Sequence, residues 1–222
     1  MCPQHDHCYS SAARHPTSAR PKSKNDLKKF LRHHWELMVA ADFFTTEVWT
    51  SKGLTRYLIL FFIDLSTRKV AIAGIASRAN GLWMSQVGRN ATDAVDGILN
   101  GKRFLIHDRD PLFTAEFQSI LKSVGVDCVK LPPRSPNLNA YAERFVRSIK
   151  ESCLKRLILF GEQSLRRAIR EFVAHYHHER NHQGKGNVLL FPPSRQARAY
   201  ASPIGCRERL GGLLKYYDRE AA

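Results

Sequence analysis

Apolar runs separated by short polar breaks divide the first half of the chain into predicted strands. The runs cover residues 35–46, 54–65 and 68–76 and are rich in Val, Ile, Leu and Phe. The breaks, at residues 51–53 and 66–67, contain Ser, Thr, Lys and Gly. Because connections this short join neighbouring antiparallel strands, the pattern predicts an antiparallel meander.

Helical and extended patterns alternate in the second half of the chain. The whole order, β-β-β-α-β-α-β-α-α, predicts an α/β fold with a mixed five-stranded sheet flanked by helices. A Pro-rich loop at residues 132–139 precedes the last two helices. The expected strands here are 103–107 and 126–131, and the expected helices are 82–99, 114–124, 140–157 and 164–178.

The two ends of the chain differ in composition from this body. Residues 1–27 are rich in Ser, Pro, His and basic residues, which predicts a flexible basic arm. Residues 28–183 carry the strand and helix patterns and are expected to form the folded core. Residues 184–222 are basic and rich in Gly, Pro and Tyr, and we expect an irregular tail there.

Charge narrows the choice of partners. The chain has 35 Lys and Arg against 20 Asp and Glu, a formal net charge of +15. Such a surplus favours polyanions, with nucleic acid ahead of an acidic membrane surface. No apolar run approaches the roughly 20 residues that span a bilayer, and the five cysteines are scattered. We therefore expect a soluble protein of a reducing compartment.

Three acidic residues occupy positions where a metal ion could use them. Asp42 lies in the middle of the first predicted strand, where a carboxylate is costly unless it is paired or binds metal. Asp108 directly follows a predicted strand, at the end where α/β sheets place ligands. Glu143 lies on the helix after the Pro-rich loop. Asp42 could instead be structural, and Glu143 could be an ordinary solvated glutamate.

Sequence motifs around two of these acids resemble those of the integrase core shared by retroviral integrases and bacterial insertion-sequence transposases. Residues 107–113, HDRDPLF, are similar to the family's S-D-N-G-S-E-F motif. Residues 135–144, SPNLNAYAER, are similar to S-P-x-x-N-G-x-x-E-R, and the spacing between the two acids is close to the family's. Residues 176–182, YHHERNH, resemble a later Y-N-x-x-R-P-H segment.

The resemblance implies a ribonuclease H-like catalytic core with an Asp, Asp, Glu triad. Asp42, Asp108 and Glu143 would be the catalytic residues and the ligands of two Mg²⁺ or Mn²⁺ ions. The chain departs from the motif at Arg109 and Asp110, where the family usually has Asn and Gly. Asp110 is therefore an alternative or auxiliary ligand, and we prefer Asp108 because it directly follows the strand.

Basic residues surround Glu143 in the sequence. In a helix, Arg147 and Lys150 follow Glu143 by four and seven residues, so the three share one face. We expect these two cations to contact DNA phosphates, and we name Arg144 and Asn139 as further DNA-binding candidates. The alternative is a solvated cationic helix face.

The predicted function is that of a DNA transposase or integrase, a DDE-type polynucleotidyl transferase that cleaves DNA and transfers strands. Its expected partners are the element ends, the target DNA and further copies of the chain, with no membrane. Its expected location is the cytoplasm of a bacterial-type cell, at the nucleoid. Two alternatives stay open: a ribonuclease H-like nuclease, or a truncated DNA-binding remnant, because residues 1–34 show no helix-turn-helix or zinc pattern.

Overall fold

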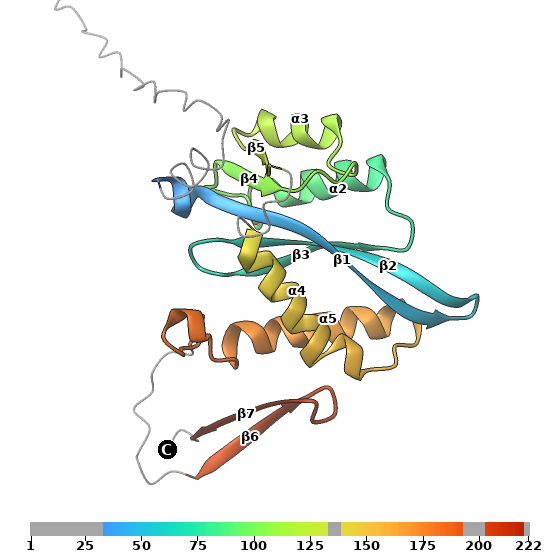
Figure 1. The fold of residues 1–222 in the computed structure, drawn as a ribbon, viewed down its shortest axis with the longest axis vertical. Helices are drawn as coiled ribbons and strands as arrows, with labels where there is room; N and C mark the ends of the chain where they lie inside the picture. Colours follow the sequence, from blue (N-terminus) through green and yellow to red (C-terminus); the bar gives the residue numbers. More distant parts are fainter. Residues whose placement is uncertain (1–32, 133–138, 193–202, 220–222) are drawn as a thin grey trace, which may run out of the picture.

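The computed structural model describes residues 33–132, 139–192 and 203–219. The predicted N-terminal arm and most of the Pro-rich loop lie outside these residues. A five-stranded mixed sheet in the order β3-β2-β1-β4-β5 forms the centre, as predicted (Figure 1). Its strands are β1 (Met38–Thr50), β2 (Gly53–Asp64), β3 (Val70–Ala76), β4 (Phe104–His107) and β5 (Asp127–Lys130).

Helices cover both faces of the sheet (Figure 1). None of the described helices is both long and apolar enough to cross a membrane. The α-helices are α2 (Gly81–Ala91), α3 (Ala115–Ser123), α4 (Ala140–Ser152) and α5 (Gly161–His178), and the 3-10 turns are η1 (Trp35–Leu37), η3 (Leu154–Arg156) and η4 (Gln183–Lys185).

The central strand β1 pairs with a different kind of neighbour on each side. It runs antiparallel to β2, with Asp42 opposite Phe61. It runs parallel to β4, and this pairing ends at Ala40 and Ile106. Parallel strands end at the same edge of a sheet, so the residues that follow Ile106 emerge beside the middle of β1.

Successive residues of β1 face two different hydrophobic cores. Val39 and Ala41 belong to the core under α2 and α3. Ala40 and Phe44 belong to the core under α4 and α5. Because side chains alternate along a strand, Asp42 points in the second direction, toward the layer that contains α4.

The helix predicted over residues 82–99 ends earlier, at Ala91. The hydroxyl of Thr92 donates to the carbonyl of Gly88 at 2.9 Å. The Asp93 carboxylate accepts from the backbone N–H of Val95 at 2.9 Å. Short polar side chains that bond nearby backbone groups compete with the helical ladder, so the chain turns here.

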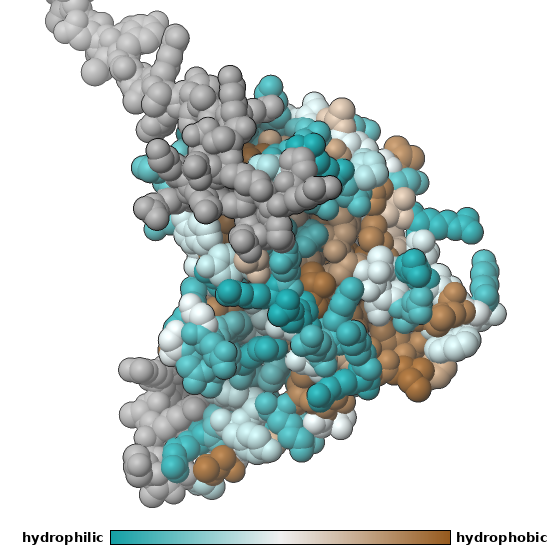
Figure 2. All heavy atoms as spheres, viewed as in Figure 1, coloured by the Kyte–Doolittle hydropathy of each residue, from teal (hydrophilic) through white to brown (hydrophobic). Residues whose placement is uncertain are grey.

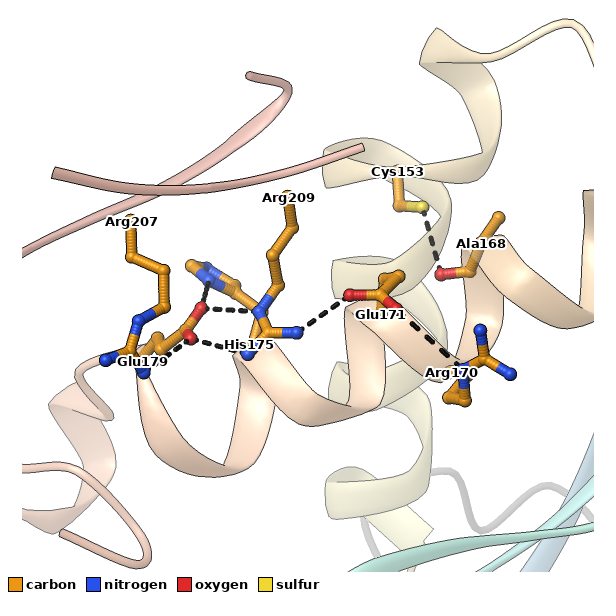
Figure 3. A network of polar contacts seen from close by, with 8 residues as sticks. All are labelled: Cys153, Ala168, Arg170, Glu171, His175, Glu179, Arg207 and Arg209. Atoms are coloured by element: carbon orange, nitrogen blue, oxygen red, sulfur yellow. Dashed lines mark hydrogen bonds and ion pairs between the residues drawn. The ribbon is translucent and has the colours of Figure 1, made fainter. Parts of the chain in front are cut away.

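The predicted irregular C-terminal tail is wrong over residues 204–219, which form an antiparallel hairpin of β6 (Ile204–Arg209) and β7 (Leu214–Arg219). Leu214 is buried in the α4–α5 core. Arg209 binds Glu179 at 2.7 Å and Glu171 at 2.7 Å, both from the α5 region (Figure 3). The two strands are mostly polar and lack the apolar alternation from which a strand can be predicted, so the sequence did not indicate them.

Candidate active site

Asp42 is the one acid of the predicted triad that lies inside the sheet. Its Oδ1 accepts a hydrogen bond from the backbone N–H of Phe43 at 2.8 Å. Burial raises the pKa of Asp42 to about 6, and the negative charges of Asp108, Glu143 and Asp110 act in the same direction. Four acids from three separate parts of the sequence therefore share one electrostatic site.

Asp108 stands at the end of β4, on a tight polar turn. It follows the last β1–β4 pair by two residues, as Asp42 does on its own strand. Its Oδ1 accepts from the backbone N–H of Asp110 at 3.1 Å. The Asp110 carboxylate in turn accepts from the N–H of Leu112 at 2.8 Å. These two successive turns hold both acids at the sheet edge next to β1.

His107, the last residue of β4, contacts both ends of this turn, and the sequence did not identify it as a site residue. The residue is fully buried. Its ring lies 4.2 Å from the Phe113 ring between centroids, and Nδ1 lies 2.7 Å from the carbonyl oxygen of Asp108. Burial lowers the pKa of His107, which keeps the ring neutral at neutral pH. The imidazole is thus placed to orient the Asp108 backbone. No sequence pattern predicted this role.

Glu143 is an exposed residue in the first turn of α4. The buried residues of this helix are Ala142, Phe145 and Ile149. Phe145 packs 4.8 Å from Phe61 between ring centroids, and Phe61 is the residue opposite Asp42 in the β1–β2 pair. This packing fixes α4 over the part of β1 that carries Asp42, and it explains why the charge of Glu143 reaches that carboxylate.

The four predicted DNA-binding residues fall in three different surroundings. Arg147 is exposed and Lys150 is partly exposed, and both follow Glu143 along one face of α4. Arg144 is exposed but lies about 100° around the helix from Glu143. Asn139, just before α4, is buried, and its Oδ1 has no hydrogen-bond partner within the described residues. All four assignments stay predictions.

The acid cluster can be tested for its fit to a divalent cation. Asp42, Asp108, Asp110 and Glu143 offer the hard oxygen donors that Mg²⁺ and Mn²⁺ prefer. The charges of the other three acids disfavour the ionised form of Asp42, and a bound cation would offset that repulsion. Within residues 33–132, 139–192 and 203–219, no three His, Cys, Asp or Glu side chains are placed so as to hold a metal ion. The residues fit by donor type and charge, without a finished coordination shell.

Comparison with known proteins agrees with this architecture. Residues 124–188 match the family model described as integrase core domain. No curated protein matches the chain. Among solved structures, the catalytic domain of Mos1 mariner transposase is 14% identical, over 68% of this chain and 76% of that domain, with a TM-score of 0.53. At this identity the likeness shows a shared fold, and the predicted fold, a mixed five-stranded sheet flanked by helices, is confirmed.

Two viral structures are also similar, at lower TM-scores. The HTLV-2 integrase catalytic core domain, solved in complex with magnesium, is 17% identical over 64% of this chain and 86% of that domain, with a TM-score of 0.48. The simian T-cell lymphotropic virus intasome in complex with PP2A regulatory subunit B56 gamma is 15% identical, over 82% of this chain and 66% of the matched chain, with a TM-score of 0.49. The fold comparison rests on the transposase domain.

Proposed function

We propose that this chain, whose residues 124–188 match the family model described as integrase core domain, is a DNA transposase or integrase that cleaves DNA and joins the cut end to target DNA. One observation carries the proposal: burial raises the pKa of Asp42 in the central strand, and the charges of Asp108 and Glu143 raise it further. A structural aspartate of a strand would have no reason to meet two further acids from a loop and a helix.

Asp42, Asp108 and Glu143 would hold two Mg²⁺ or Mn²⁺ ions, with Asp110 as an auxiliary ligand. Such ions, when bound, activate the attacking oxygen and stabilise the leaving oxygen of a phosphodiester. The chain contributes position and charge. β1 keeps Asp42 fixed in the sheet, His107 orients the Asp108 backbone, and Arg147 and Lys150 offset the negative charge of the phosphates.

The proposed chemistry consists of two phosphoryl transfers. In the first, water attacks a phosphorus atom at the element end, and the P–O3′ bond breaks to leave a 3′ hydroxyl and a 5′ phosphate. In the second, that 3′ hydroxyl attacks a target phosphodiester. One P–O bond forms as one breaks, the attacking hydroxyl loses its proton, and the displaced target 3′ oxygen gains one. The reaction therefore requires no oxidant and no nucleotide energy source.

The partners in this proposal are two kinds of DNA, the element ends and the target. A net charge of +15 favours both through their phosphates. Joining two ends requires that two ends be held together, so we propose that several copies of the chain act on paired ends. The site of action is wherever the element's DNA lies, which we take to be the cytoplasm of a bacterial-type cell.

A strand-transfer assay tests the proposal. The substrate is labelled duplex DNA copied from the sequences that flank the gene, with Mn²⁺ or Mg²⁺ and a supercoiled target. We expect Asp42→Asn, Asp108→Asn and Glu143→Gln to abolish joining while circular dichroism shows the fold kept. Glu151→Gln removes the same charge from an exposed position of the same helix and should join like the wild type. Full activity of all three triad variants would overturn the proposal.

Two further assays, cleavage of an RNA–DNA hybrid and a gel shift of terminal duplexes, separate the alternatives. A ribonuclease H-like nuclease would cleave an RNA–DNA hybrid and would not join DNA ends. A remnant that only binds DNA would shift terminal duplexes in a gel without cleaving either substrate.

A further inference from the structure

A pocket of about 680 Å³ opens between α4, the end of α5, the β2–β3 turn and η4. Figure 2 shows hydrophilic residues gathered over α4 and η4 on this side of the molecule. The described lining contains no Asp or Glu. Its basic members are Arg68, Arg144, Arg147, Arg180, His182 and Lys185.

The arginines and the lysine of this pocket form no ion pair with a carboxylate in the part of the chain that the structure describes. Elsewhere arginines do find such partners, as Arg209 does with Glu179 at 2.7 Å. Burial lowers the pKa of His182, and the charges of Arg180, Lys185 and Arg68 lower it further. The pocket is therefore a region of positive potential for which residues 33–132, 139–192 and 203–219 supply no paired carboxylate.

Arg68 presents a buried guanidinium nitrogen to the pocket side of the molecule without a hydrogen-bond partner among the described residues. Its backbone has a φ of 68°, in the left-handed region that non-glycine residues seldom adopt. Its guanidinium carbon lies 3.0 Å from the centroid of the Tyr141 ring. Nη1 is buried and has no hydrogen-bond partner within the described residues. A buried donor without an acceptor is costly, and an anion in the pocket would supply the acceptor.

Hydrogen bonds within the protein fix the η4 side of the pocket, which contains His182 and Lys185, in the absence of a ligand. Nζ of Lys185 donates to the carbonyl of Ser66 at 3.1 Å, which joins η4 to the β2–β3 turn. Nε2 of His182 donates to the carbonyl of Tyr176 at 2.8 Å. A Cβ atom added at Gly184 would lie 3.8 Å from Nη1 of Arg144, so that side chain spans from α4 to η4. The cations are thus presented by four preorganised elements.

We infer that this pocket binds a backbone phosphate of DNA, at a place separate from the acid cluster. The inference rests on the proposed function, which supplies DNA as the ligand.

The residues of α4 separate the pocket from the acid cluster. Arg144 and Ser148 line the pocket, whereas Glu143 and Lys150 do not. Arg147 lines the pocket and also shares the helix face of Glu143. A strand whose phosphates meet the acids can therefore pass Arg147 and place a later phosphate among Arg68, Arg144 and Arg180.

Salt-dependent DNA binding by the full chain tests the inference. Affinity for a fluorescent duplex is measured by anisotropy over a series of salt concentrations in EDTA, where no cleavage is needed. Each phosphate contact contributes about 0.9 to the slope of log affinity against log salt concentration. We expect Arg144→Gln and Arg180→Gln each to reduce the slope by about that amount. Arg167→Gln removes one charge from an exposed position of α5 outside the pocket and should leave the slope unchanged.

Two further arms make every outcome decisive. Arg180→Lys keeps the charge and should keep the slope, which guards against a folding defect in Arg180→Gln. If the pocket variants and Arg167→Gln have equal slopes, DNA binding at the pocket is refuted. If inorganic phosphate at constant ionic strength then raises the Tm of the wild type but not of Arg180→Gln, the phosphate bound is a free one.

Failure of the proposed function would look different. In that case strand transfer is absent or survives in the triad variants, while the slopes measured in EDTA still separate the pocket variants from Arg167→Gln. Conversely, normal strand transfer with equal slopes would remove only the pocket inference.

Discussion

Asp42 and Asp108 each stand two residues beyond the last paired residues, Ala40 and Ile106, of the parallel β1–β4 pair. The two carboxylates therefore come level at one edge of that pair, although Asp42 continues within β1 and Asp108 begins a turn. Burial raises the pKa of Asp42, and the charge of Asp108 raises it further as a result. Parallel pairing is the reason that a strand interior and a strand end can supply one site.

Replacing Asp42 by Asn should stabilise the fold while it abolishes strand transfer. The pKa of Asp42 is raised from 3.8 to about 6, mainly by burial, so ionisation costs the folded state more than the unfolded state. This penalty is absent below pH 3.8, grows as the pH rises to about 6, and is complete above it. At pH 8 in a chelator we expect a gain of about 1–3 kcal/mol in the free energy of unfolding, measured by urea denaturation.

The control for this gain is Glu151→Gln, which removes a charge from an exposed site on α4. Its unfolding free energy should stay within about 0.5 kcal/mol of the wild type. Two results would contradict a destabilising, ionised Asp42. One is an equal free energy of unfolding for the wild type and Asp42→Asn at pH 8. The other is a gain from Asp42→Asn at pH 3.5 as large as the gain at pH 8.

Asp108 and Asp110 should differ in their importance for strand transfer. The Asp110 carboxylate accepts from the N–H of Leu112, and an Asn side-chain oxygen can accept the same bond. We expect Asp110→Asn to lower the strand-transfer rate by about 10- to 100-fold, the usual effect of losing a supporting group. Asp108→Asn should leave no measurable joining. Single-turnover rates of the two variants decide the ranking, and the reverse order would make Asp110 the main ligand.

The sheet could be predicted from the sequence because its strands carry strong local signals. Three consecutive β-branched and aromatic runs with short breaks specify β1, β2 and β3, and the order of later elements specifies a mixed sheet. Boundaries were less predictable. The first strand continues past Thr46 to Thr50 because Val48 is buried and Thr50 pairs with Gly53, and such cross-strand pairing is not written in the local sequence.

The site was only partly predictable, for a physical reason. Asp42, Asp108 and Glu143 stand in or next to ordered elements, so motif and spacing could select them. Arg68 and Arg180 reach one pocket only through tertiary packing. The sequence placed Arg180 in the 176–182 motif but gave no sign that Arg68, in a turn more than 100 residues earlier, lies beside it. His107 sits at the end of an apolar strand, where the sequence cannot tell a core histidine from a positioning one.

Gly74 should resist even the smallest substitution, because β3 and α2 meet there. A Cβ at Gly74 would lie 2.5 Å from Cζ2 of Trp83. We expect Gly74→Ala to destabilise the fold by about 1–3 kcal/mol, since the indole must move out of its packed position. In Gly81→Ala the added Cβ would lie 3.8 Å from its nearest neighbour, on Thr114, so urea denaturation should show no loss. Equal stabilities of the two variants would argue against close β3–α2 packing.

The docking of the C-terminal hairpin should weaken in acid. Glu179 is buried and accepts bonds from Arg209 at 2.7 Å and from His175 at 3.1 Å (Figure 3). Burial alone would raise the pKa of Glu179, but these bonds lower it from 4.5 to about 2. A depressed carboxyl pKa stabilises the folded state fully above pH 4.5, and the contribution is lost as the pH falls from 4.5 toward 2. The protection factors of residues 204–219 in hydrogen exchange, each referred to the intrinsic exchange rate at the same pH, should fall across that window.

Arg209→Gln should remove most of this pH dependence and destabilise the hairpin at neutral pH, because it leaves Glu179 buried without its main partner. We expect the free energy that holds the hairpin to α5 to fall by about 3–5 kcal/mol, which is typical of breaking a buried ion pair. Lys215→Gln breaks an exposed pair with Glu208, 2.8 Å long, in the same hairpin, and should leave hydrogen exchange of the hairpin nearly unchanged, because exposed ion pairs contribute little to stability. If the two variants exchanged equally fast at neutral pH, the Arg209–Glu179 pair would not be what holds the hairpin to α5.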